Sequence, residues 1–248
     1  FSNVKDRVKN INRIYLVLDG PLQSLPLETL VSEPTINDNY REASWLVNDY
    51  ELLYLTGVND FISFKKKEKE VITFAKSYIA FADPNLSDNE GVTRSSLKID
   101  QLFDNRGVIN IEEIKQLPSL PETAEEVKSI AGILDADFND LYLQNDANEE
   151  KVKAIDLSKS KVISFATHGL VSGEIRGLTE PALVLTPPNE VSELNDGLLK
   201  SSEIALLDLN TDLVVLSACN TASSDGSPGA EGLSGLAKSF FIAGAKGI

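Results

Sequence analysis

Short runs of branched, apolar residues alternate with helical segments along most of this chain. Each run is long enough for one strand, and the runs are too continuously apolar for a sheet with one face in water. From Pro121 onward, apolar residues at Val127, Ile130 and Leu134 form one stripe of a helix. Parallel strands need helical crossovers, so this order predicts an α/β fold with three layers: a mostly parallel central sheet with helices on both faces. Strands are predicted at 14–18, 77–82, 161–166, 182–185 and 213–217, with a further strand-rich region at 45–55. Further helices are predicted at 61–74, 149–156 and 231–243. Another helix is predicted after residue 200, with Ser201 or Ser202 as its cap.

Composition excludes several classes of function. The 248 residues are 42% hydrophobic, and 38 acidic against 23 basic residues give a net charge of −15. Such a charge repels nucleic acid and anionic lipid, and no apolar run has the length of a membrane helix. We therefore expect a cytoplasmic protein that binds neither nucleic acid nor membrane. One cysteine and one histidine cannot form a disulfide or a usual structural zinc site, so we expect no metal and no cofactor.

The chain is expected to have two parts. Residues 83–118 show no sustained period, which predicts a long connection or lid rather than a packed element. This segment ends an amino-terminal part, 1–118, and a catalytic half, 119–248, follows it. The last residues, AGAKGI, suggest that a new buried strand begins there, so the catalytic half is expected to be truncated at its carboxyl end.

The only histidine and the only cysteine each follow a predicted strand. His168 comes after the strand 161–166 and Cys219 after the strand 213–217. Reactive groups of parallel sheets gather beyond the carboxyl ends of the strands, so neighbouring strands here predict a thiol–imidazole dyad. The backbone N–H groups of Gly169 and Cys219 are candidate oxyanion donors. The alternative is that Cys219 is a small core residue and His168 a turn residue.

Several motifs resemble those of one family. FATHG, EPALVL, DGLLKSSEI, DLVVLSACNT and GAEGLSGLAKSFFIAGAKGI together look like the CHAT domain, a caspase-like cysteine peptidase domain related to separases and caspases. The resemblance implies a three-layer caspase-like fold in which 1–118 is a pseudo-caspase-like part. It also implies that His168 is the base and Cys219 the nucleophile of peptide-bond hydrolysis, with Gly169 in the oxyanion hole. It further implies a protein substrate, and a tetratricopeptide-repeat region in the same polypeptide.

The sequence departs from the pattern of related metacaspases at one position. Those proteins carry an acid two residues before the cysteine that helps to bind a basic side chain, whereas this chain has Ser217 there. Ser217 and Asp225 are therefore only candidate substrate-binding residues. Glu231 is a further acid in this region, but an acid also suits its position at the amino terminus of the last predicted helix.

Three functions remain to be compared. The leading hypothesis is a regulated cysteine endopeptidase that cleaves specific proteins through a Cys–His dyad. Its alternative is a catalytically inactive scaffold or binding module of the same fold. A flavodoxin-like nucleotide or receiver domain needs an acid cluster or glycine loop after the first strand, where only Asp19 is available.

Overall fold

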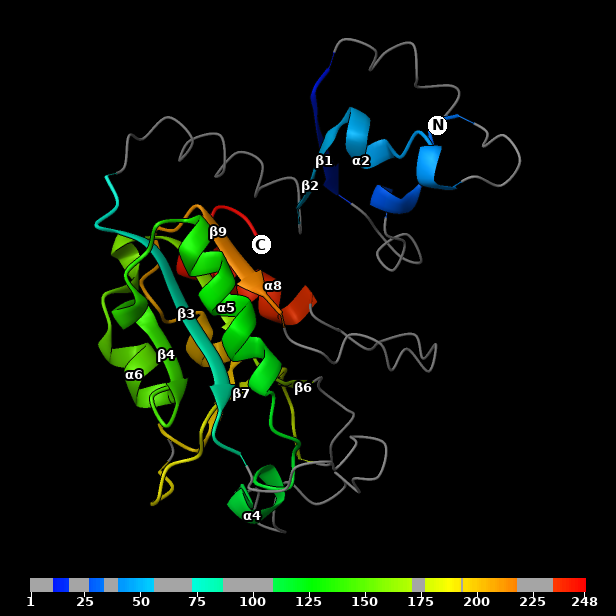
Figure 1. Ribbon diagram of the computed structural model, residues 1–248. Coiled ribbons are helices and arrows are strands. Elements are labelled where there is room, and N and C mark those ends of the chain that lie inside the picture. Colours follow the sequence, from blue (N-terminus) through cyan, green and yellow to red (C-terminus); the bar gives the residue numbers. More distant parts are fainter. Residues whose placement is uncertain are drawn as a thin grey trace. The chain divides into compact units, whose positions relative to one another are not determined.

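The computed structural model describes residues 11–17, 27–33, 40–55, 73–86, 109–170, 177–192, 194–217 and 234–248. Figure 1 shows the chain with these parts as coloured ribbons. It divides into two compact units, Phe1–Val71 and Ile72–Ile248. The predicted helix at 61–74 lies almost entirely outside the described residues, and the boundary after residue 118 stays a prediction.

The first unit contains a small parallel sheet. Strand β1 (Arg13–Val17) pairs with β2 (Glu51–Leu55), and the short helix α2 (Leu46–Asp49) precedes β2. Arg13 donates two hydrogen bonds to the Glu51 carboxylate across this pair, at 2.7 and 3.0 Å. The strand predicted at 14–18 is confirmed, whereas the region 45–55 is part helix and part strand. Two 3-10 helices, η2 (Leu27–Thr29) and η3 (Tyr40–Glu42), complete the described part of this unit.

The second unit is built on a four-stranded sheet in which every pair is parallel. Its strands lie in the order β4-β3-β5-β9, so β5 is an inner strand with β3 on one side and β9 on the other. Helix α5 (Pro121–Ile133) connects β3 to β4, and α6 (Glu149–Ala154) connects β4 to β5. The predicted parallel sheet is confirmed. The strands span Lys76–Pro84 (β3), Leu141–Gln144 (β4), Ser160–Ala166 (β5) and Leu213–Leu216 (β9), with 3-10 turns at Phe138–Asp140 (η6) and Leu157–Lys159 (η7).

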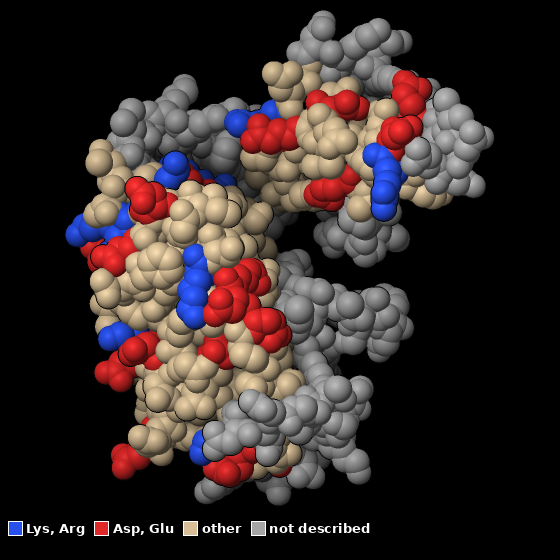
Figure 2. All heavy atoms as spheres, in the orientation of Figure 1, with Lys and Arg blue, Asp and Glu red and all other residues tan. Residues whose placement is uncertain are grey.

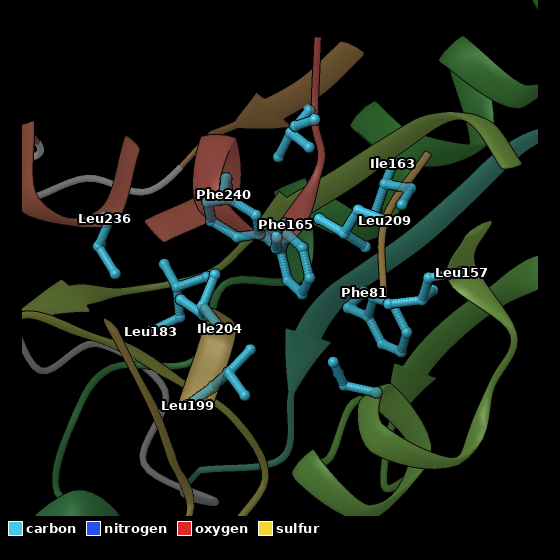
Figure 3. Packing of buried hydrophobic residues seen from close by; sticks show 14 of the residues in the cluster. Phe81, Leu157, Ile163, Phe165, Leu183, Leu199, Ile204, Leu209, Leu236 and Phe240 are labelled. Carbon is cyan, nitrogen blue, oxygen red and sulfur yellow. The ribbon is translucent and has the colours of Figure 1, made fainter. Parts of the chain in front are cut away.

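Helices cover both faces of this sheet, and the two faces carry side chains of different size. On the α5 face, Val127 and Ala131 pack over Tyr78, Ala80 and Ala166. On the opposite face, larger aromatic rings fill the space under α7 (Ser201–Ile204) and α8 (Ser234–Ala243). The ring of Phe165 lies between those of Phe81 and Phe240, with centroid distances of 5.3 and 5.4 Å (Figure 3). The three-layer α/β architecture of the prediction is therefore confirmed.

A second, antiparallel sheet continues from the end of β5. It comprises β6 (Gly169–Leu170), β7 (Ala182–Val184) and β8 (Leu198–Lys200) in that order. Its buried residues pack against Ile114 of helix α4 (Ile111–Ile114) and against Leu117. The interpretation of 83–118 as unpacked is thus wrong for 109–118, because these apolar side chains are buried; 87–108 lie outside the described residues.

Some predicted details of the helices differ from the structure. Helix α7 begins at Ser201, but neither serine caps it: both hydroxyl groups donate to the Glu180 carboxylate, at 2.7 and 2.9 Å. The Glu203 carboxylate instead accepts from the backbone N–H of Lys200, which precedes the helix. Helix α6 is capped by Asn148, whose side chain accepts from the backbone N–H of Lys151.

The last residues lie beside the edge strand without forming a strand themselves. The N–H of Lys246 donates to the carbonyl of Thr211, and the N–H of Val214 donates to that of Gly247. The expected new strand is therefore replaced by two isolated backbone contacts with the β9 region. Across the described parts of the chain, no helix has the length and apolar character needed to cross a membrane.

The aromatic layer predicts where the second unit is most sensitive to mutation. Replacing the fully buried Phe165 by alanine leaves a cavity between two rings, so the free energy of unfolding should fall by about 3–5 kcal/mol. The matched control Phe138→Ala removes a ring that is 58% exposed and should cost less than about 1 kcal/mol. Urea unfolding of both variants checks this. Equal losses in the two would contradict the assigned core.

Candidate active site

The residues of interest lie where the strands of the parallel sheet end. Side chains alternate between faces along a strand, so Ser164 and Ala166 of β5 face α5, while Phe165 faces the aromatic layer. Strand β9 is paired to β5 in register, with Ser164 opposite Val215 and Phe165 opposite Leu216. The sequence predicts a thiol–imidazole dyad on the condition that these two strands are neighbours. The structure confirms that they are neighbours.

His168 lies two residues beyond the end of β5 and is buried, with 3% of its surface exposed. Its Nε2 atom is 2.8 Å from the carbonyl oxygen of Pro118. A carbonyl oxygen can only accept, so Nε2 carries the ring proton in this contact. A neutral imidazole has one such proton, which makes Nδ1 the nitrogen that can accept another. The contact therefore fixes both the orientation of the ring and its basic atom.

The segment that carries Pro118 is itself anchored at both ends. Leu117, just before it, is buried in the cluster beneath the second sheet. After it, the hydroxyl of Thr123 donates to the Leu120 carbonyl at 2.7 Å and accepts from the backbone N–H of Asp83 at 2.9 Å. The first turn of α5 is thus bound to the end of β3. This bond limits how far the Pro118 carbonyl can move from His168.

The ends of β3 and β4 have an unusual backbone. Asp83 has φ 46° and Gln144 has φ 52°, a left-handed region that non-glycine residues seldom occupy. The Gln144 amide donates a hydrogen bond to the Asp83 carboxylate, which ties the two ends together. Burial raises the pKa of the Asp83 carboxyl, and the Gln144 bond opposes that rise. Asp83 lies at a bulge, where the register of β3 with β4 shifts between Ala82 and Pro84, and Gln144 is the last residue of β4.

Ser217 follows β9 and contacts the helix that covers this face. Its N–H donates to the carbonyl of Phe165 at 2.9 Å, which extends the pairing of β9 with β5 by one bond. Its hydroxyl donates to the carboxylate of Glu126 on α5 at 3.1 Å. Ser217 thus lies beside an acid that another element, helix α5, supplies.

The structure brings together only some of the predicted site residues. Gly169 is buried in β6, opposite Leu183 of β7, directly after His168. Cys219, Asp225 and Glu231 lie outside the described residues. Their predicted roles stay predictions.

Sequence reasoning did not find two residues of this site. Pro118 acts through its backbone carbonyl, which every residue possesses, so no side-chain pattern marks it. In the sequence, Glu126 is marked only by its position beside Val127, which belongs to the buried apolar stripe of the helix.

The surface of α5 is acidic. Its acids Glu122, Glu125 and Glu126 outnumber the single Lys128, and Figure 2 shows red surface over this part of the second unit. Among the described residues no group of three or more potential ligands could hold a metal ion.

The contact of His168 with Pro118 makes a prediction about its proton. Because this is the only histidine, a protein labelled with nitrogen-15 in histidine gives one set of imidazole signals. In the neutral form we expect the proton on Nε2 and an unprotonated Nδ1, as seen in a two-bond proton–nitrogen correlation spectrum. A neutral ring protonated on Nδ1 would contradict the geometry described above.

Comparison with known proteins gives one result. The family model described as "CHAT domain" matches residues 1–248, the whole chain. No curated protein and no solved structure matches it. The matched family is the one that the FATHG and SACNT motifs resemble, and the observed three-layer fold with its parallel sheet is consistent with the caspase-like fold. The chain therefore belongs to the CHAT domain family.

Proposed function

We propose that this chain is a cysteine endopeptidase in which Cys219 is the nucleophile and His168 the base. The register of β5 and β9 is the observation that carries this proposal. Paired residues keep a constant separation along the chain, from Val162↔Leu213 to Phe165↔Leu216. His168 and Cys219 have that same separation in residue number. The proposal continues this register past the strand ends, which would bring the two residues side by side at the spacing of about 5 Å between adjacent strands.

The alternation of side chains supports the same pairing. Ser217 contacts α5. Cys219 is two positions further along, so the proposal takes the chain to continue in an extended conformation, which would direct Cys219 to the same face. His168 is likewise two positions beyond Ala166, which packs on the α5 face. Its ring contacts Pro118, the segment that leads into α5. A nucleophile and a base on one face of adjacent strands satisfy the first geometric requirement of a dyad.

The proposed chemistry follows from the protonation of His168. Nδ1 takes the proton of the Cys219 thiol, and the thiolate sulfur bonds to the scissile carbonyl carbon of the substrate. Backbone N–H groups of Gly169 and Cys219 stabilise the negative oxygen that forms. The imidazolium then gives its proton to the leaving amine as the C–N bond breaks. Water hydrolyses the thioester and restores the thiol.

The remaining roles rest on the resemblance to the family. Ser217 and Asp225 are proposed to contact the substrate near the cleaved bond. The substrate is proposed to be a specific protein rather than peptides at large. A tetratricopeptide-repeat region of the same polypeptide is proposed as the partner that controls access to the site.

The dyad can be tested with peptide probes that carry an acyloxymethyl ketone. The thiolate displaces the carboxylate of such a probe and forms a thioether, which intact mass detects. We expect labelling of the wild type at Cys219, none in Cys219→Ala, and a rate reduced at least 100-fold in His168→Gln. All three proteins should melt cooperatively, which shows that the variants fold.

A different outcome would favour the inactive scaffold. If the folded wild type is labelled no faster than a short unstructured peptide containing cysteine, Cys219 is not activated. If His168→Gln reacts as fast as the wild type, the histidine does not act on the thiol. Either result overturns the peptidase and leaves the fold assignment intact.

A further inference from the structure

We propose that Thr167 is a positioning residue for His168, because its hydroxyl group fixes the short segment that carries the histidine. Thr167 lies between the last residue of β5 and His168. It is completely buried, and its hydroxyl donates a hydrogen bond to the backbone carbonyl of Val184 in β7. This inference rests on the proposed function, since it concerns how the proposed base is held.

Val184 holds this segment through both of its backbone polar groups. Its carbonyl accepts from the Thr167 hydroxyl, and its N–H donates to the carbonyl of His168 at 2.8 Å. The next residue of the segment, Gly169, is paired with Leu183 of the same strand. The hydroxyl is the only donor that the Thr167 side chain has. Without it, the Val184 carbonyl loses this donor in a buried place, where the loss of a partner is costly.

The support for the main chain of His168 and the support for its ring belong to one apolar cluster. The side chain of Val184 is fully buried in the same cluster as that of Leu117, which directly precedes Pro118. Strand β7 therefore holds the carbonyl of His168, and the Pro118 carbonyl holds the ring at Nε2. The Thr167 hydroxyl adds a bond between this cluster and the end of β5. It thus limits how far His168 can move relative to both supports.

A second buried threonine makes the same kind of bond at the other end of β5. The hydroxyl of Thr211 donates to the backbone carbonyl of Lys161 at 2.7 Å, and Thr211 is also completely buried. Lys161 is the second residue of β5, whereas Thr167 follows the last one. The two threonines match in burial and in the kind of bond, and they differ in their distance from His168 along the strand. Thr211 is therefore a control for the general effect of losing a buried hydroxyl.

The test replaces each threonine by valine, which has nearly the same shape but no hydroxyl. In Thr167→Val we expect acyloxymethyl ketone labelling of Cys219 to slow by about 10- to 100-fold, the effect of one lost hydrogen bond at a buried site. We also expect the two-bond spectrum of neutral His168 to show a mixture of tautomers instead of the form protonated on Nε2 alone. Thr167→Ser keeps the hydroxyl and should restore the wild-type rate and tautomer. Thr211→Val should be destabilised to a similar extent and keep both.

The outcomes separate this inference from the proposed function. If no probe labels the folded wild type, the peptidase is contradicted, and the tautomer of His168 in Thr167→Val still decides the role of Thr167. That role is overturned if Thr167→Val keeps the wild-type tautomer, if it is labelled at the wild-type rate, or if Thr211→Val slows labelling equally. Should Thr167→Val fail to melt cooperatively, Thr167→Ser decides: the wild-type tautomer supports the role, and a mixture of tautomers overturns it.

Discussion

The register of strand β5 between β3 and β9 is the constraint on which the second unit depends. Because β5 is covered on both faces, a shift by one residue would exchange the side chains of its two faces. Phe165 would then meet α5 instead of Phe81 and Phe240, and Ala166 would leave a gap in the aromatic layer. The packing of the core therefore also determines on which face His168 emerges. Stability and the proposed chemistry share one structural requirement.

Helix α5 and the segment before it link the ends of these strands to the residues of the site. Its first turn is bound to the end of β3 through Thr123, and the segment before it offers the Pro118 carbonyl to His168. One turn further on, Glu126 meets Ser217 after β9. One helix thus contacts the ends of three strands. Helix α5 and the segment just before it thus contact both Ser217 and His168, the latter being the proposed base.

Much of this fold follows from local patterns in the sequence, whereas the contacts of the site do not. The strands at 161–166 and 213–217 are short apolar runs, and their pattern predicts both strands and the exit of His168. Full burial holds better for β5 than for β9, an edge strand in which only Val214 is buried. The caps of α7 were predicted wrongly, because Glu180, remote in sequence, binds the serine hydroxyls that would otherwise cap the helix. Helix α4 has only four residues, too few to show a period. Backbone partners such as the Pro118 carbonyl leave no trace in residue type.

The central claim is that position 168 lies beside Cys219 on the α5 face. The most direct measurement is disulfide formation in His168→Cys under mild oxidation, since adjacent strands bring Cα atoms to a distance that a disulfide can span. Thr167→Cys is the matched control, because the Thr167 side chain donates to Val184 of β7 and so points to the other side. The account predicts that mild oxidation removes both free thiols of His168→Cys, the introduced one and that of Cys219, and that reduction restores them. Thr167→Cys should keep both of its thiols free under the same oxidation. Equal crosslinking in both variants, or none in His168→Cys, would contradict it.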